Sequence, residues 1–490
     1  MSINLHVPGH IATPLLAVGV LVCGVLIALQ PMFALVFVGL GFFVALARIP
    51  PVAHLVVLVG VTAIVPFGVQ NSLGIGGGAG SPGLLPSDAL LIVGLLRLTP
   101  ILLRRHFGAR LLIGAFLIGA FVSVAGLQFV RALDLGRDPS TVGAELRVLL
   151  GFATFLLAIP VVADARQRRQ LLRALPILGL VLGMWGLAQW GLELSFSGAG
   201  DAGVREGVRL TTAGRGQVQG GLFGFPVAVV LGLAALMSGQ VRSLNGRVLL
   251  VAVVVLNVIC TLLTFERTFW VATVLACGFV VVKAEGVQRA RGVFGAVAGL
   301  ILLFVVLSTL APAELTTARE RLLSLSQYGS DNSVRYRLTE SRHVLEQISE
   351  HPLAGAGLGA SIYFGRPWEL VPPSSETFAH NGYLWLAWKL GIPAAMLLWF
   401  LMGAAIVRRG PPLDDPLLQS VVYGSQGALL GLVVTSVTFP SFNQLSITST
   451  MGLLMALCLS PRLRTPAMGD GHPAPSSMTS AAVTATSRIK

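Results

Sequence analysis

Long apolar runs, separated by short polar connections, cover most of this sequence. A membrane-spanning α-helix needs about 20 consecutive, mainly apolar residues, and by that measure the pattern predicts about fourteen spans. Because several runs are short or interrupted by Gly or Pro, we expect about 12–14 transmembrane helices in an all-α polytopic membrane protein. The predicted spans lie near 11–29, 32–47, 52–69, 87–103, 111–130, 145–164, 175–194, 221–238, 248–265, 269–283, 293–311, 383–407, 417–437 and 443–460.

One long polar interval, residues 312–382, interrupts the apolar runs and is expected to form a large extracytoplasmic loop. Within it, the side chains of 331–333 can cap a helix, apolar residues recur at helical spacing, and Pro352 ends the pattern. The loop is therefore predicted to contain an amphipathic helix, with a second short helix at 315–326. The residues expected to face inward on the first helix are Val334, Leu338, Ser341, Leu345 and Ile348.

Composition supports the membrane class and excludes others. Of the 490 residues, 54% are hydrophobic and 11% are charged, whereas soluble domains average about 25% charged residues. A soluble multidomain protein of this length would need more polar surface, and a disordered chain would be far less apolar. Only the tail 461–490, rich in Ala, Ser, Thr and Pro, is predicted to be disordered.

No cofactor or metal site is indicated by the sequence. The four cysteines lie in apolar stretches and form no CxxC or Cys/His cluster, which argues against a disulfide framework and a zinc site. Neither a GxxxxGK(S/T) phosphate-binding loop nor a GxGxxG turn after a strand is present. Carboxylate pairs with metal-ligand spacing are also absent, so a cytosolic NTPase or a metal-dependent hydrolase has no support.

The net charge of +13, from 34 Lys and Arg against 21 Asp and Glu, would suggest nucleic-acid binding in a soluble protein. In a membrane protein, basic residues mark cytoplasmic loops instead, so no nucleic-acid partner is expected. With fourteen spans, all the basic loops fall on one side, which predicts that both termini are cytoplasmic. These loops lie at 48, 104–110, 166–173, 242–247, 283–291, 408–409 and 462–464.

A second set of basic residues, all arginines, falls on the opposite, outer side. Arginine suits bidentate recognition of phosphate or carboxylate groups. For most of these arginines, ordinary solvated charge partly paired with loop glutamates is the favoured interpretation. They are Arg131, Arg137, Arg205, Arg209, Arg215, Arg267, Arg319, Arg321, Arg335, Arg337, Arg342 and Arg366.

Arg267 differs from the others because it lies between two apolar runs with almost no loop. A charge this close to the membrane is costly, and it is usually functional or paired. Pairing with the adjacent Glu266 is the alternative, and a functional role is favoured.

His380 lies just before the predicted span 383–407, at the outer surface. Its imidazole can exchange a proton near neutral pH. The alternative is an interfacial histidine in an aromatic belt with Tyr383, Trp385 and Trp388. Position alone supports both interpretations equally.

The segment that begins at His380 resembles the signature of the O-antigen ligase and O-antigen polymerase superfamily. That signature is His, then Asn, Ser or Gln, nine residues, Gly, two residues and Thr. His380, Asn381 and Gly391 fit it, whereas Ala394 stands in place of the Thr.

Three upstream elements are similar to the same superfamily. Arg337 begins a loop segment that ends in Pro-Leu-Ala-Gly-Ala-Gly, although Ser341 stands where Trp is common. Arg267 before an apolar span is similar to the family's Ser-Arg element, with Glu266 in place of the small residue. Arg215, followed by Gly-Gln-Val-Gln, occupies the place of a further family arginine.

This resemblance implies a GT-C-like glycosyltransferase in the cytoplasmic membrane of a bacterium. It would transfer a glycan from a polyprenyl diphosphate carrier, such as undecaprenyl diphosphate, to an acceptor hydroxyl at the outer face, without metal or cofactor. Its partners would be that donor, a glycan or glycolipid acceptor and membrane lipid. The implied organisation has N-terminal membrane helices at 1–194, a ligase-like catalytic region at 195–460 and the cytoplasmic tail at 461–490.

The resemblance also implies residue roles. The catalytic residues would be His380, Arg267 and Arg337. His380 would act either as the base for the acceptor hydroxyl or as a hydrogen-bond donor to the diphosphate, and the arginines would stabilise the leaving diphosphate. Asn381 would hold the histidine ring or contact sugar. The substrate-binding residues would be Arg215, Asn381, Arg335 and Glu376.

Several functional alternatives stay open at this point. A ligase would attach a finished polymer to a lipid acceptor, whereas a polymerase would join repeat units. A transporter or flippase for lipid-linked sugars predicts charges near the membrane midplane and broken helices. A structural subunit of an envelope complex would use the large loop to dock a partner.

Overall fold

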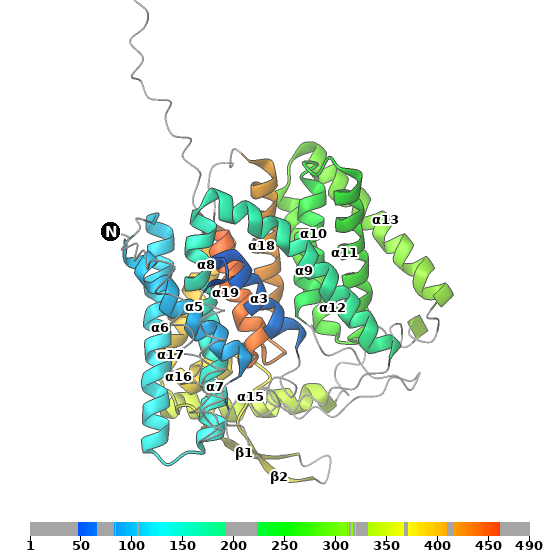
Figure 1. Cartoon of the computed structure of the whole chain (residues 1–490). Helices are drawn as coiled ribbons and strands as arrows, with labels where there is room; N and C mark the ends of the chain where they lie inside the picture. The colour runs from blue at the N-terminus through cyan, green and yellow to red at the C-terminus, as the bar shows by residue number, and fades with distance from the viewer. Residues whose placement is uncertain are drawn as a thin grey trace, which may run out of the picture.

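The computed structural model of the chain describes residues 48–65, 83, 85–104, 107–192, 223–310, 312, 315–316, 319, 332–366, 371–408 and 415–460. Within these ranges the protein is almost entirely helical (Figure 1). Each predicted span from 52–69 onward overlaps at least one helix, so the all-α polytopic class is confirmed. The predicted spans 11–29 and 32–47, and the tail 461–490, lie outside the described residues.

The helices keep the labels of Figure 1. They are α3 (Pro51–Ile64), α5 (Pro86–Arg104), α6 (Ala109–Asp134), α7 (Pro139–Leu150), α8 (Thr154–Ala163), α9 (Ala165–Gly191), α10 (Gly224–Met237), α11 (Leu244–Leu263), α12 (Arg267–Lys283), α13 (Gly286–Leu310), α15 (Asn332–Glu350), α16 (Gly382–Leu390), α17 (Ile392–Val407), α18 (Pro416–Thr435) and α19 (Leu445–Cys458). Short 3-10 turns lie at Gly151–Ala153 and Ser441–Asn443.

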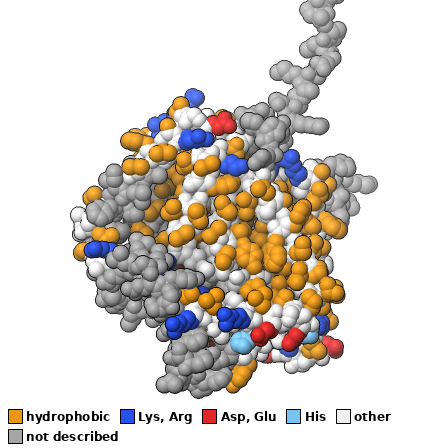
Figure 2. Space-filling view, turned by 180° about the vertical axis from the view of Figure 1, so that it is seen from behind, with side chains coloured by type: hydrophobic (Ala, Val, Ile, Leu, Met, Phe, Trp, Pro, Cys, Tyr) orange, Lys and Arg blue, Asp and Glu red, His pale blue; other side chains and the backbone are white. Residues whose placement is uncertain are grey.

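Five helical stretches in the described part are long and apolar enough to cross a membrane. They are Ala109–Asp134, Pro139–Ala163, Ala165–Gly191, Leu244–Leu263 and Pro416–Thr435. Figure 2 shows a broad apolar band on one flank of the molecule, with charged side chains gathered above and below it. Such a band between two charged rims is the surface that a bilayer covers.

Helix α18 lies at the centre of the bundle, against α10 and α12. Three glycines along α18 make this close packing possible. A Cβ at Gly424 would come within 2.8 Å of the Ala234 side chain, and one at Gly427 within 2.8 Å of the Ala276 carbonyl. Gly431 also packs against α12, beside the same Ala276. Small residues at such spacing let helix backbones approach in a membrane, and they fix where the end of α18 lies.

Helix α15 runs across one end of the bundle (Figure 1). Its bounds confirm the predicted amphipathic helix, but the predicted inward side was right only for Ile348 and wrong for Leu338 and Leu345. Leu338 and Leu345 are 54% and 51% exposed. The buried residues are Tyr336, Glu340, Val344 and Ile348. The apolar pattern misplaced the face because it counted Glu340 as a solvent-facing residue.

A two-stranded hairpin also lies at this end, and the sequence did not predict it. Antiparallel strands β1 (Ile362–Arg366) and β2 (Val371–Glu376) pair Ile362 with Glu376. Two prolines occupy β2. Because proline cannot donate to a strand ladder and is confined to strand edges, the segment does not look like a strand in the sequence.

The predicted span 383–407 is two helices, not one. Gly391 separates α16 from α17 and has a φ of 87°. A Cβ at this position would overlap the Leu353 carbonyl. Glycine is needed for both reasons, since the left-handed conformation and the close approach of two backbones each exclude a side chain.

Candidate active site

His380 is held by a buried carboxylate from α15. Its backbone N–H donates to Oε2 of Glu340 at 2.8 Å, and its Nδ1 lies 3.1 Å from Oε1 of the same side chain. The Glu340 side chain is fully buried, whereas 14% of the His380 side chain is exposed. Sequence analysis missed this role of Glu340, because the two residues lie 40 positions apart and the carboxylate has no motif of its own.

Two aromatic rings flank the imidazole of His380. The ring centroids of Tyr336 and Phe378 lie 5.5 Å and 5.3 Å from that of His380. Tyr336 lies one helical turn before Glu340 on the same buried side of α15. The Glu340 carboxylate binds Nδ1 of His380, and Nε2 makes no hydrogen bond to any described residue. The ring therefore offers Nε2 to a substrate.

Asn381 caps helix α16. Its Oδ1 accepts hydrogen bonds from the backbone N–H groups of Tyr383 and Leu384, at 3.0 Å and 3.1 Å. This is the usual arrangement at a helix N-terminus, where the first N–H groups lack helical partners. The next residue, Gly382, donates its N–H to the Ser436 carbonyl at 2.8 Å. The Asn381 cap and the bond from Gly382 together fix the start of α16, and with it the position of His380, which directly precedes the cap.

Arg267 is the first residue of α12, directly after a strained turn. Phe265 has a φ of 54° and is buried; for a bulky residue this conformation is an outlier. Strain of this kind tends to persist at functional sites. The hydroxyl of the next residue, Thr268, lies 2.9 Å from the hydroxyl of Thr438.

Residues 436–438, the exit segment of α18, therefore contact the starts of two helices. Ser436 binds the start of α16, and Thr438 binds the start of α12. Packing of the rings of Phe223, Phe269 and Phe439 stabilises this junction, with centroids 4.9 to 5.4 Å apart. The structure thus brings the helix that begins with Arg267 and the helix that follows His380 to the same end of the bundle.

Arg337 lies on α15, three residues before Glu340. Residues at this spacing are neighbours on a helix surface. Its Nε is buried and makes no hydrogen bond to any described residue. A buried donor without a partner is rare in native proteins and carries a free-energy cost. An anionic group bound beside His380 would provide the missing acceptor.

The remaining sequence candidates are placed differently. Arg335 is exposed and lies on the opposite side of α15 from Arg337. Glu376 ends β2 opposite Ile362 and is partly exposed. Arg215 lies outside the described residues. For Arg335, Glu376 and Arg215, substrate binding stays a prediction.

A glycine-rich turn, residues 354–360, connects α15 to the hairpin and is held from α6 and from the loop between α6 and α7. Arg137 donates to the carbonyls of Ala356 and Leu358, at 2.6 Å each. Gln128 donates to the carbonyl of Ala354, also at 2.6 Å. Burial lowers the pKa of Arg137. These bonds determine how α15, with its active-site residues, sits against the bundle.

Lys389, near the end of α16, secures the same turn from the other side. It pairs with Glu145 of α7 at 2.7 Å and donates to the Ala360 carbonyl at 2.6 Å. Glu145 in turn accepts the N–H of Gly359 at 2.7 Å. A lysine inside a predicted membrane span is costly unless it is paired, and the structure shows Lys389 paired with a carboxylate.

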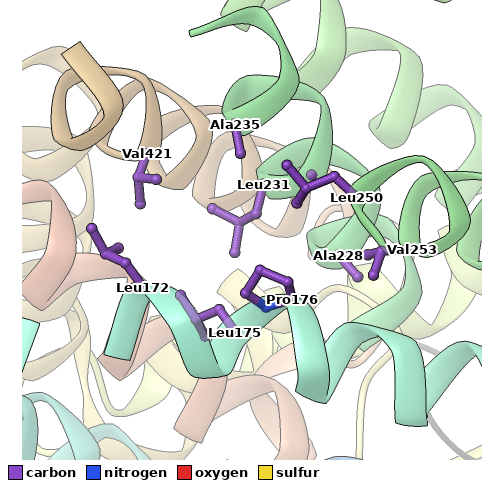
Figure 3. A pocket seen from close by; sticks show the side chains of 10 residues that line it. Leu172, Leu175, Pro176, Ala228, Leu231, Ala235, Leu250, Val253 and Val421 are labelled. Carbon is purple, nitrogen blue, oxygen red and sulfur yellow. The ribbon is translucent and has the colours of Figure 1, made fainter. Parts of the chain in front are cut away.

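The pocket in Figure 3 is separate from this site. It is apolar and lies between α9, α10, α11 and α18, with a cavity volume of about 50 Å³. On α18 it is lined by Val421, about 22 Å along the helix from Ser436. The pocket has no polar side chain to take part in chemistry.

The arrangement around His380 can accept a proton at Nε2 and bind an anion at Arg337. No group of His, Cys, Asp and Glu that could hold a metal ion occurs among the described residues. In comparisons with known proteins, the family model described as O-antigen ligase matches residues 252–399. That range includes Arg267, Arg337, Glu340 and His380. No curated protein sequence matches the chain.

Proposed function

Residues 252–399 match the O-antigen ligase family model, and from this match we propose that the chain is a member of the O-antigen ligase and O-antigen polymerase superfamily with a specific reaction. The protein is a membrane glycosyltransferase of a bacterial inner membrane. It transfers a glycan from a polyprenyl diphosphate carrier, such as undecaprenyl diphosphate, to an acceptor hydroxyl. Its partners are that lipid-linked donor, a glycan or glycolipid acceptor and membrane lipid. The product belongs to cell-surface polysaccharide biosynthesis.

One observation carries this proposal: a proton acceptor and an unsatisfied cationic donor lie on neighbouring elements. His380 has Nε2 without a hydrogen-bond partner in the described part of the chain, while Arg337 has a buried Nε in the same state. An acceptor hydroxyl needs a base, such as Nε2 of His380, to take its proton. A departing diphosphate needs a cation, such as Arg337, to stabilise its negative charge. A transfer from a diphosphate carrier uses both groups in one step.

The reaction follows from these groups. Nε2 of His380 takes the proton of the acceptor hydroxyl as its oxygen attacks the anomeric carbon of the donor sugar. The bond from that carbon to the phosphate oxygen breaks, and the electron pair leaves with the polyprenyl diphosphate. Arg337 and Arg267 stabilise the negative charge that develops there. We assign the same role to Arg215, on the family resemblance alone.

The distribution of charge supports an outward-facing site. The segments 166–173, 242–247 and 283–291, at the starts of α9, α11 and α13, are basic and lie at the end of the bundle away from α15 (Figure 1). Basic loops are cytoplasmic by the positive-inside rule. The site at α15 would then face outward, where a polyprenyl-linked glycan ends after translocation.

The transporter alternative is less well supported by the contacts. It predicts charged residues near the midplane that bind solute. Among the described residues, the fully buried side chains of Lys389 and Glu145 bind each other and the backbone of the glycine-rich turn, and that of Glu340 binds His380. Their contacts serve the positioning of α15 rather than a solute path.

A reconstituted transfer assay tests the proposal. The full chain in proteoliposomes is given an undecaprenyl diphosphate-linked glycan and an acceptor, and wild type is compared with His380→Gln and Arg342→Ala. We expect transfer by wild type and by Arg342→Ala, which alters an exposed arginine of α15, and a loss of about 10²–10⁴-fold for His380→Gln.

The product distinguishes the two branches of the family. Lengthening of the glycan without a lipid acceptor identifies a polymerase, and transfer that requires a glycolipid identifies a ligase. Movement of the lipid-linked sugar between leaflets without any transfer product would overturn the proposal in favour of a transporter.

A further inference from the structure

We infer that Glu340 is a positioning residue that fixes the tautomer of His380, so that Nε2 carries the lone pair that receives the acceptor proton. This inference rests on the proposed function for its consequence in catalysis, but not for its geometry. The motif that carries the family resemblance includes His380 and Arg337 and assigns nothing to position 340. The role of Glu340 is visible only from the folded chain.

The hydrogen-bond inventory around Glu340 determines the tautomer. An ionised carboxylate only accepts hydrogen bonds. Oε2 receives the backbone N–H of His380, and Oε1 lies 3.1 Å from Nδ1. Nδ1 must therefore carry the hydrogen, and in the neutral ring Nε2 is then the acceptor. Because the backbone N–H and the ring bind the same carboxylate, the ring cannot turn over without breaking the contact with Nδ1.

Burial gives this contact its strength. The Glu340 side chain has no exposed surface, and water therefore does not screen its interaction with the imidazole. A buried carboxylate beside a neutral partner is unfavourable, whereas the same carboxylate beside an imidazolium forms an ion pair. Proton transfer from the acceptor hydroxyl to Nε2 produces that imidazolium. Glu340 thus stabilises the state that the reaction creates.

The same helix contains a matched pair that lacks these properties. His343 lies 3.1 Å from Glu346 through Nδ1, the distance found between His380 and Glu340. The side chains of His343 and Glu346 are 40% and 68% exposed. Exposed pairs contribute little, so Glu346 provides a control with the same chemistry, the same helix and no expected influence on transfer.

A direct measurement of the tautomer tests the inference without any substrate. The full chain, labelled with nitrogen-15 in its histidine rings, is reconstituted in nanodiscs and studied by NMR, and the His380 signals are identified by their loss in His380→Gln. We expect the Nδ1–H tautomer in the neutral ring of wild type and of Glu346→Gln. In Glu340→Gln, the amide can donate to Nδ1, and the Nε2–H tautomer should appear.

The transfer assay adds the consequence for catalysis. Glu340→Gln should lower kcat by roughly 10²-fold with little change in the KM for the donor, and Glu340→Asp should recover part of the loss. Glu346→Gln should match wild type. If Glu340→Gln fails to fold, the tautomer of wild type alone decides the inference.

The two proposals can fail separately. An Nε2–H tautomer in wild-type His380 overturns the role of Glu340, and so does a Glu340→Gln variant that keeps both the wild-type tautomer and the wild-type kcat. Absence of transfer by wild type, with the Nδ1–H tautomer present, overturns the glycosyltransferase proposal and leaves the geometric assignment in place.

Discussion

The ammonium of Lys389 and the carboxylate of Glu145 lie 2.7 Å apart, and neither side chain is exposed. The pair joins α16 to α7, and each partner also binds the glycine-rich turn between them, through Ala360 and Gly359. A buried ion pair is weak evidence of net stability, since desolvation offsets much of the attraction. Here its consequence is geometric: it ties the helix after His380 to the turn after α15.

Removal of one member of this pair should therefore be costly. We expect Lys389→Met to lower the free energy of unfolding by about 3–5 kcal/mol, because Glu145 is left as an uncompensated buried charge. The double variant with Glu145→Gln should be less destabilised than the sum of the single variants, since the glutamine still accepts from Gly359. Denaturation in detergent measures both.

A control pair establishes that this coupling is specific. Lys389→Met combined with Glu346→Gln, which changes an exposed carboxylate, should be additive within about 0.5 kcal/mol. Additivity in the Lys389 and Glu145 cycle as well would contradict the structural role assigned to the pair.

The junction between α16 and α17 gives a second prediction. Gly391→Ala places a side chain at a φ of 87° and against the Leu353 carbonyl, and we expect a loss of at least about 2 kcal/mol of stability. Gly403→Ala in α17 is the matched control, because a Cβ there meets nothing within 4 Å. It should be neutral or stabilising by up to about 1 kcal/mol. Similar melting temperatures for the two variants would contradict this account.

Arg337 and Arg342 separate a site arginine from a surface arginine on the same helix. We expect Arg337→Ala to reduce transfer by about 10²–10³-fold, the effect of losing one charge-stabilising donor, while the melting temperature changes little. Arg342→Ala should retain wild-type transfer because its side chain is exposed. Equal activity of the two variants would remove Arg337 from the site.

The sequence predicted the helices because apolar runs of this length have few other solutions in a membrane. The same reasoning located α15 from its caps and from Pro352. It failed for the inward face of that helix, where Leu338 and Leu345 are exposed and Glu340 is buried. Periodicity records which side chains are apolar, and a buried carboxylate that serves a histidine 40 residues away is invisible to it.

The candidate site was predictable in part for the same reason. His380, Arg267 and Arg337 each stood out locally, through position near the membrane or through family resemblance. The partner of His380 and the pairing of Lys389 with Glu145 depend on which helices pack together, and the latter pair spans 244 positions in sequence. The hairpin at 362–376 was missed because Pro372 and Pro373 argue against a strand.

The last prediction concerns Arg267, which begins α12 directly after the strained turn at Phe265. If this arginine binds the diphosphate through two N–H groups, a lysine at this position keeps the charge but loses the planar pair of donors. We expect Arg267→Lys to lower kcat/KM by about 10- to 100-fold, which corresponds to one charge-assisted hydrogen bond. Arg267→Ala should lose more.

Arg289→Lys is the control for this substitution. Arg289 lies in α13, just beyond the opposite end of α12 from Arg267, and donates only to the backbone carbonyls of Ala284 and Val282 in the described structure. Its replacement should leave transfer within about twofold of wild type, because a conservative surface change moves stability by less than about 0.5 kcal/mol. Full activity of Arg267→Lys would show that a point charge suffices, and the diphosphate would then be recognised through Arg337.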